Sequence, residues 1–187
     1  MPPAVNDAEK TVQERDFGFD GLEGAEGACG KGLRFGERFV IWGVRVWAQS
    51  QSQSSGTAHY HCATLRRAFD LAGIGEAHLV FDRLMTAIQA HSLRDIGLHA
   101  PRCRSVSPDE LSILGIVAEG QAGVVSDALM SKLIAAEGRD EVGRAAQRLA
   151  FLLARRGMYV RALSPVEGNA ADGRTAQVEP DEPRLLH

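Results

Sequence analysis

The start of a helix at residue 107 constrains the fold of this chain more than any other feature of its sequence. Ser107 is followed by Pro108 and, three residues after the serine, by Glu110. The serine hydroxyl can accept a hydrogen bond from the first turn, the proline loses no helical bond there, and the glutamate can reach back to the cap N–H. This pattern predicts a capping box, and we interpret Asp109 and Glu110 as capping residues rather than as catalytic acids.

Apolar residues that recur at helical spacing predict a helix after this cap and five others. The expected helices cover residues 34–49, 58–71, 76–93, 108–120, 124–136 and 140–156. The serine- and glutamine-rich stretch at 50–57 is expected to be a loop. We therefore predict an all-α fold, a single compact bundle of about six helices over residues 33–163. Residues 1–32 and 164–187 are polar and lack a hydrophobic period, so we expect disordered tails.

Composition narrows the class of protein. The chain has 187 residues, 44% of them hydrophobic, and a formal net charge of -3, which argues against a general nucleic-acid or membrane surface binder. It shows no apolar leader and no apolar run long enough to cross a bilayer. Three cysteines do not suggest a disulfide framework. With its many alanines, arginines and glycines, the chain is expected to be a bacterial cytoplasmic protein with free thiols.

A histidine and a cysteine in the turn before the helix form a candidate metal or thiol site. His99 and Cys103 flank Pro101, and a separation of four residues can bring an imidazole and a thiolate to one zinc ion. His59 and Cys62 share a face of the second predicted helix and would complete four ligands. The alternative is that no cofactor binds and that the cysteines are ordinary buried or free thiols.

Motifs typical of several enzyme classes are absent from the sequence. We find no glycine-rich phosphate loop, no Gly-x-Ser-x-Gly turn and no His-Glu-x-x-His zinc motif. We therefore favour a non-enzymatic regulatory or adaptor protein that acts through contacts with a protein partner or by self-association. In this hypothesis the His/Cys turn is a structural zinc site or a thiol sensor. One alternative is a metal- or thiol-dependent enzyme that uses Cys103 as nucleophile and His99 as base.

A second alternative is a DNA-binding transcriptional regulator. Residues 108–163 are expected to form three helices and then a short strand at 158–163, an order that resembles a winged helix. The polar side of the last helix offers Arg144, Arg148 and Arg155 for contact with nucleic acid. Because residues 105–165 contain seven acidic and seven basic residues, this alternative is not favoured over protein binding.

Overall fold

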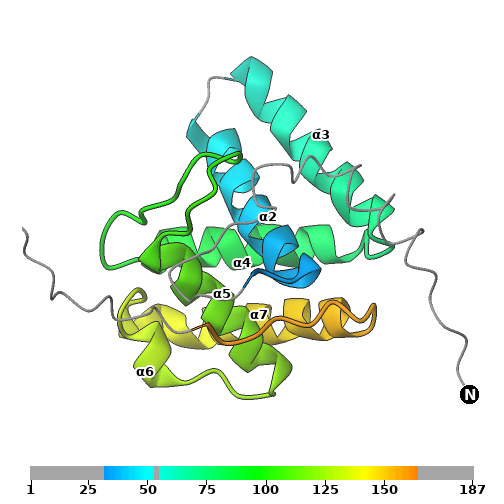
Figure 1. Ribbon diagram of the computed structural model, residues 1–187. Coiled ribbons are helices and arrows are strands. Elements are labelled where there is room, and N and C mark those ends of the chain that lie inside the picture. Colours follow the sequence, from blue (N-terminus) through cyan, green and yellow to red (C-terminus); the bar gives the residue numbers. More distant parts are fainter. Residues whose placement is uncertain (1–31, 53–54, 164–187) are drawn as a thin grey trace, which may run out of the picture.

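The computed structural model describes residues 32–52 and 55–163, and within them it contains six α-helices, one short 3₁₀-helix and no strand (Figure 1). The prediction of an all-α bundle is therefore confirmed. The predicted tails lie outside the described residues. The elements are α2 (Phe35–Ser52), α3 (Ser55–Leu71), α4 (Ala77–His91), α5 (Pro108–Gln121), α6 (Asp127–Met130), η1 (Ala136–Gly138) and α7 (Arg139–Ala154).

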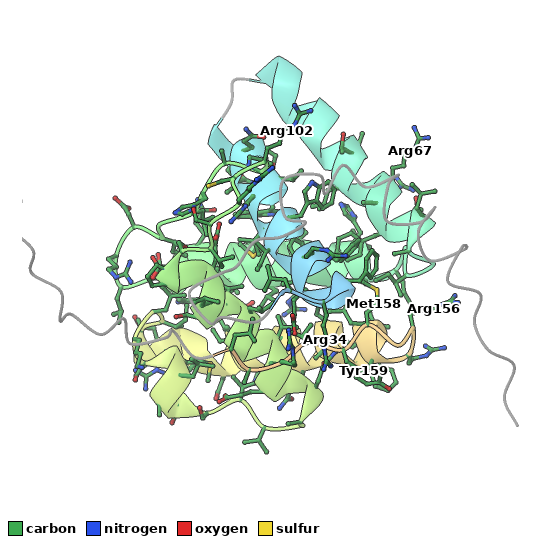
Figure 2. All side chains as sticks on the ribbon, in the orientation of Figure 1. Arg34, Arg67, Arg102, Arg156, Met158 and Tyr159 are labelled. Atoms are coloured by element: carbon green, nitrogen blue, oxygen red, sulfur yellow. The ribbon has the colours of Figure 1, made fainter. Side chains whose placement is uncertain are left out.

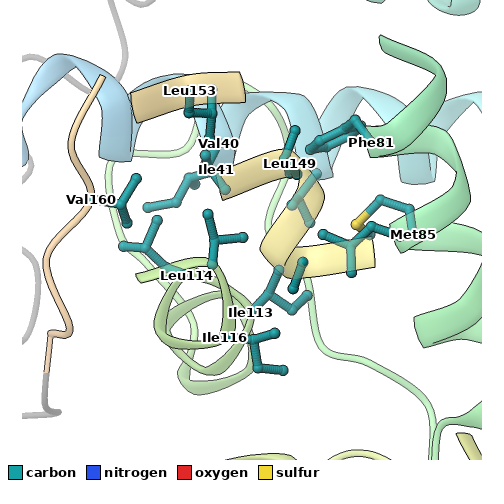
Figure 3. Close-up of a cluster of buried hydrophobic side chains, with 14 of the residues drawn as sticks. Val40, Ile41, Phe81, Met85, Ile113, Leu114, Ile116, Leu149, Leu153 and Val160 are labelled. Carbon is teal, nitrogen blue, oxygen red and sulfur yellow. The ribbon is translucent and has the colours of Figure 1, made fainter. Parts of the chain in front are cut away.

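Helix α5 is the central element of the bundle. Ten of its 14 residues are buried, so its apolar surface extends around the whole helix rather than along one stripe. It packs against α7, α2 and α6. Figure 3 shows Ile113 and Leu114 of α5 in one apolar cluster with Ile41 of α2 and Leu149 of α7. The N-terminal end of α5 has the predicted capping box, which stabilises the start of this buried helix.

Aromatic residues join α2 to α3 and α4. The Phe39 ring meets the Phe69 ring edge to face, with centroids 5.0 Å apart, and Phe69 lies 5.4 Å from Phe81. All three side chains are buried. Trp47 is also buried, and its indole N–H donates a 2.8 Å hydrogen bond to Asp82 of α4. The helical prediction for the aromatic run of α2 is thus confirmed, and this helix anchors the core.

Two local predictions are wrong. The segment 50–57 is mostly helical, because α2 continues to Ser52 and α3 begins at Ser55; its serines and glutamines do not interrupt a helix as proline does. The helix expected over 124–136 is reduced to the four residues of α6 and the turns after it. There the backbone bonds to the segment after α4 instead: Leu93 donates to Leu133, and Ala135 donates to the carbonyl of His91.

The segment 158–163 is extended but forms no strand, which corrects the expectation of a winged-helix strand in this part of the chain. Side chains of other helices satisfy its backbone. Gln121 of α5 accepts a bond from the Val160 N–H and donates one to the Met158 carbonyl, at 2.9 Å each. Arg161 pairs with Glu37 of α2 at 2.6 Å. The segment therefore runs as a strap that closes the bundle (Figure 1).

Two helical glycines differ in what surrounds them, and this difference predicts opposite effects of the same substitution. A Cβ at Gly120 would lie 3.1 Å from the backbone of Ala146 in α7, whereas a Cβ at Gly143 would meet nothing within 4 Å. We expect Gly120→Ala to destabilise the protein by about 1 kcal/mol or more, because helix backbones cannot easily move apart. Gly143→Ala should stabilise it by about 0.5–1 kcal/mol. Urea unfolding of both variants tests this, and equal shifts would contradict it.

Candidate thiol site in the loop between α4 and α5

The loop that carries the predicted His/Cys turn is fastened to the core by a buried ion pair. Arg45 of α2 binds Glu110 of α5 through two parallel bonds, Nε to Oε1 at 2.7 Å and Nη2 to Oε2 at 2.8 Å. Both side chains are completely buried. Such bidentate pairing fixes orientation as well as distance. An arginine within the apolar run of α2 was the sequence signal for this pair, and sequence analysis missed it.

The remaining polar atoms of the pair bind the loop backbone. Arg45 donates to the carbonyls of Cys103 and Ser105, at 2.6 Å each. Glu110 accepts bonds from the backbone N–H groups of His99 at 2.9 Å and Ser107 at 2.8 Å. A buried charge is tolerated only when its hydrogen-bonding capacity is used in this way. The shape of the loop from His99 to Ser107 therefore follows from the ion pair.

The carboxylate of Glu110 is kept ionised by its partners. Burial raises the pKa of Glu110, but the hydrogen bonds from Arg45 and from the Ser107 and His99 N–H groups together lower the pKa below its usual value.

A second carboxylate, that of Asp109, binds the start of the loop. Asp109 accepts two bonds from Arg94, at 2.6 and 2.7 Å, and one from the Gly97 N–H. The predicted capping residues therefore also organise the loop.

The held loop brings Cys103, His99 and Ser105 together. The Cys103 Sγ lies 3.1 Å from the Ser105 Oγ and 3.4 Å from the His99 Nδ1. The same Nδ1 lies 3.1 Å from the Ser105 carbonyl oxygen, which can only accept a bond, so we assign the ring proton to Nδ1. The Ser105 hydroxyl can then donate to the sulfur. Cys103 is half-buried, and Figure 2 shows Arg102 at the outer end of this loop.

These contacts favour the thiolate form of Cys103. Hydrogen bonds from the Ser105 side chain and backbone lower the pKa of Cys103 most strongly, and partial burial opposes them by raising it. The hydrogen bond from His99 and its electrostatic attraction for the thiolate lower the pKa of Cys103 further. The net pKa lies below the ordinary value of a thiol. A stabilised thiolate that solvent can reach is the form that reacts with oxidants and electrophiles.

The predicted zinc ligands are only partly described. His99 and Cys103 lie together, and their 3.4 Å separation is close to the roughly 3.6 Å that tetrahedral Zn–S and Zn–N bonds imply. His59 and Cys62 belong to α3, but their side chains lie outside the described residues. The described residues contain no group of three metal-ligating side chains. Zinc binding stays a prediction, and it would require the Nδ1 proton of His99 to leave.

The arginines proposed for nucleic acid lie together on a different element. Arg144, Arg148 and Arg155 are all exposed and share the outer face of α7. The exposed Phe151 lies among them. Sequence analysis missed this residue, although its spacing from the arginines placed it on their face. This face is separate from the Cys103 loop in sequence and in the elements that carry it.

Comparisons with known proteins identify no relative. No family model, no curated protein and no solved structure matches the chain. Within the described residues, no helix is both long and apolar enough to span a membrane.

The buried ion pair makes a strong prediction for stability. Glu110→Ala should destabilise the protein by about 3–5 kcal/mol, because it leaves the buried guanidinium of Arg45 without its counter-ion. Arg83→Ala, which removes an exposed pair with Glu141, should have only a small effect. Denaturant unfolding monitored by circular dichroism compares the two variants. Similar losses would show that the Arg45–Glu110 pair is not the fastening of the loop.

The thiol contacts predict how Cys103 reacts with pH. In a variant with Cys29 and Cys62 changed to serine, the alkylation rate of Cys103 should rise at a pH below the ordinary pKa of a thiol, because its thiolate is stabilised. Ser105→Ala and His99→Ala should move that rise to higher pH. Ser131→Ala, which changes a serine outside the loop, is the control. An unshifted pH profile in Ser105→Ala would contradict the assigned contact.

Proposed function

We propose that this protein is a non-enzymatic regulatory or adaptor protein of the bacterial cytoplasm, and that the redox state of Cys103 controls its contact with a protein partner. The observation that carries the proposal is the contact of the Cys103 Sγ with Ser105 and His99 in a loop fastened by a buried ion pair. This arrangement supports a sensor, because it combines a reactive thiolate with a backbone that must respond when the sulfur changes.

The sensing step needs an oxidant, for which we propose hydrogen peroxide. The Cys103 thiolate attacks one peroxide oxygen, an S–O bond forms, and the O–O bond breaks. Hydroxide leaves, and the sulfur, now a sulfenic acid, has given up two electrons. The product is neutral and larger than the thiolate. It lacks the negative charge that the Ser105 hydroxyl and the His99 ring N–H stabilise, and it must fit beside both groups.

The loop is the element that would respond. The carbonyls of Cys103 and Ser105 both accept bonds from Arg45, so a shift of the sulfur is opposed at two neighbouring points. Arg102 and Arg104 flank the cysteine, and both are exposed. A partner that contacts these two side chains would distinguish the reduced loop from the oxidised one. This geometry favours signalling through a surface over turnover of a substrate.

A thiol enzyme is less well supported by the same geometry. A cysteine–histidine pair in catalysis relies on a third group that orients the histidine. In the described part of the chain, the hydrogen bonds of the His99 ring all involve Nδ1, with the loop's own Cys103 and Ser105. The imidazole is therefore oriented by the loop, which suits stabilisation of a thiolate.

Peroxide treatment of the full chain tests the proposal. In the variant that retains only Cys103, a sulfenic-acid trap should label this residue, and amide hydrogen exchange over residues 97–107 should increase several-fold. Cys103→Ser should show neither change. Metal analysis of the purified protein before treatment tests the zinc hypothesis. One zinc ion per chain that is lost in Cys103→Ser would contradict the sensor and support a structural metal site. Labelling without any change in exchange of the loop would also count against the sensor.

A further inference from the structure

The outer face of α7 carries a second feature, which does not depend on Cys103. Arg144, Arg148, Phe151 and Arg155 follow one another at spacings of four, three and four residues, so they share one face of the helix. We call these four residues the arginine–phenylalanine stripe. All four residues are exposed, Phe151 to 53%. An exposed phenyl ring among cations is a surface that a partner of suitable chemistry can cover.

Cations flank the ring of the stripe. The guanidinium carbons of Arg148 and Arg155 each lie 5.9 Å from the centroid of the Phe151 ring, within the range of cation–π attraction. Arg155 also lies 3.8 Å from Glu76, but both side chains are 63% exposed, so this contact is weak and exchangeable. Arg148 has no acidic partner within the described residues. The stripe is therefore open to an anionic ligand that also has an apolar part.

The charge that would complement the stripe lies elsewhere in the same chain. Residues 32–163 contain 16 basic and 12 acidic residues. Residues 164–187 contain five acidic and two basic residues, and three of the acids fall within four positions in the sequence Val-Glu-Pro-Asp-Glu-Pro. Residues 1–31 are also acidic, but their seven acids are spread over twenty positions. Of these two segments, only residues 164–187 contain a dense cluster of acidic residues.

The spacing of this cluster matches the stripe. Glu179 and Glu182 each precede a proline, which favours the polyproline II conformation at both. Three residues make one turn of that helix, so the two carboxylates would lie on one side, about 9 Å apart. Arg148 and Arg155 are separated by about 10.5 Å along α7. We propose that residues 178–183 dock on the stripe of their own chain, with Glu179 and Glu182 paired to these two arginines.

The proposed contact also accounts for the ring and for the reach of the chain. Pro180 and Pro183 follow the two glutamates and supply apolar rings for contact with Phe151 in the proposed complex. Glu179 lies sixteen positions after Leu163, so the chain between them can span up to about 50 Å, about twice the 24 Å length of α7. A tether of this length gives an effective concentration on the order of millimolar, so a contact with a dissociation constant of about 1 mM would be half occupied.

A cross-linking experiment on the full chain tests this contact. Phe151 is replaced by the photoreactive p-benzoylphenylalanine, which keeps an aromatic ring at this position. On irradiation, the cross-link should map to the tryptic peptide Thr175–Arg184, and its yield should fall with added salt. Glu179→Gln with Glu182→Gln should reduce the yield about fivefold, the effect of losing two exposed ion pairs. Glu167→Gln with Asp181→Asn removes the same charge off the paired side and should leave it nearly unchanged.

Charge reversal gives an independent test. Arg148→Glu with Arg155→Glu should abolish the cross-link, and adding Glu179→Arg with Glu182→Arg should restore it. Circular dichroism checks that the variants keep their helices. We expect that they do, because the side chains of Arg148 and Arg155 are exposed. Four results would overturn the proposal. The first two are no cross-link and a cross-link to residues 1–31. The others are a yield that rises with protein concentration, which would identify a second copy, and an equal loss of yield in the Glu179/Glu182 and Glu167/Asp181 double variants.

Discussion

The buried pair of Arg45 and Glu110 is the interaction on which the rest of the structure depends. A guanidinium in an apolar interior is very unfavourable unless each donor finds an acceptor. Here a carboxylate from α5 takes two donors, and carbonyls of the intervening loop take the others. The pair therefore requires α2, the loop and α5 to meet in one arrangement. Any packing that separated Arg45 from Glu110 would leave two buried charges unpaired and is therefore disfavoured.

The thiol site is a consequence of that arrangement. Cys103 and Ser105 are exposed enough to move, but their carbonyls are bonded to a side chain that cannot. The bonds from Arg45 to the loop carbonyls thus help to hold the sulfur, the hydroxyl and the imidazole nitrogen within 3.4 Å of one another. Side chains that meet only through their own weak contacts would exchange rotamers freely. Here the loop backbone limits that freedom and keeps the Cys103 sulfur in contact with Ser105 and His99.

Local sequence patterns predicted the helices and the cap but could not predict the long-range contacts. The capping box at Ser107 depends on four adjacent residues, and the structure confirms it. The partner of Arg45 is 65 positions away, and no local rule selects Glu110 from the other acids. The helix expected at 124–136 failed for the same reason: the bonds that replace it come from His91 and Leu93, outside any local window. Proximity of His99 to Cys103 was predictable because it depends on one short turn.

The two ends of α5 decide which part of the molecule can respond to a change at Cys103. Its first turn holds the loop through Glu110, and its last residue, Gln121, holds the strap. Between them, Gly120 allows the backbone of α7 to approach closely, so a shift of α5 would press two helix backbones together. The loop residues between Leu93 and Ser105 are exposed or half-buried, so moving them disrupts no helix contact as close as that of α5 with α7. Oxidation of Cys103 to the larger sulfenic acid should therefore displace the loop and leave α5 in place. It follows that any partner that senses the oxidation must contact the loop itself.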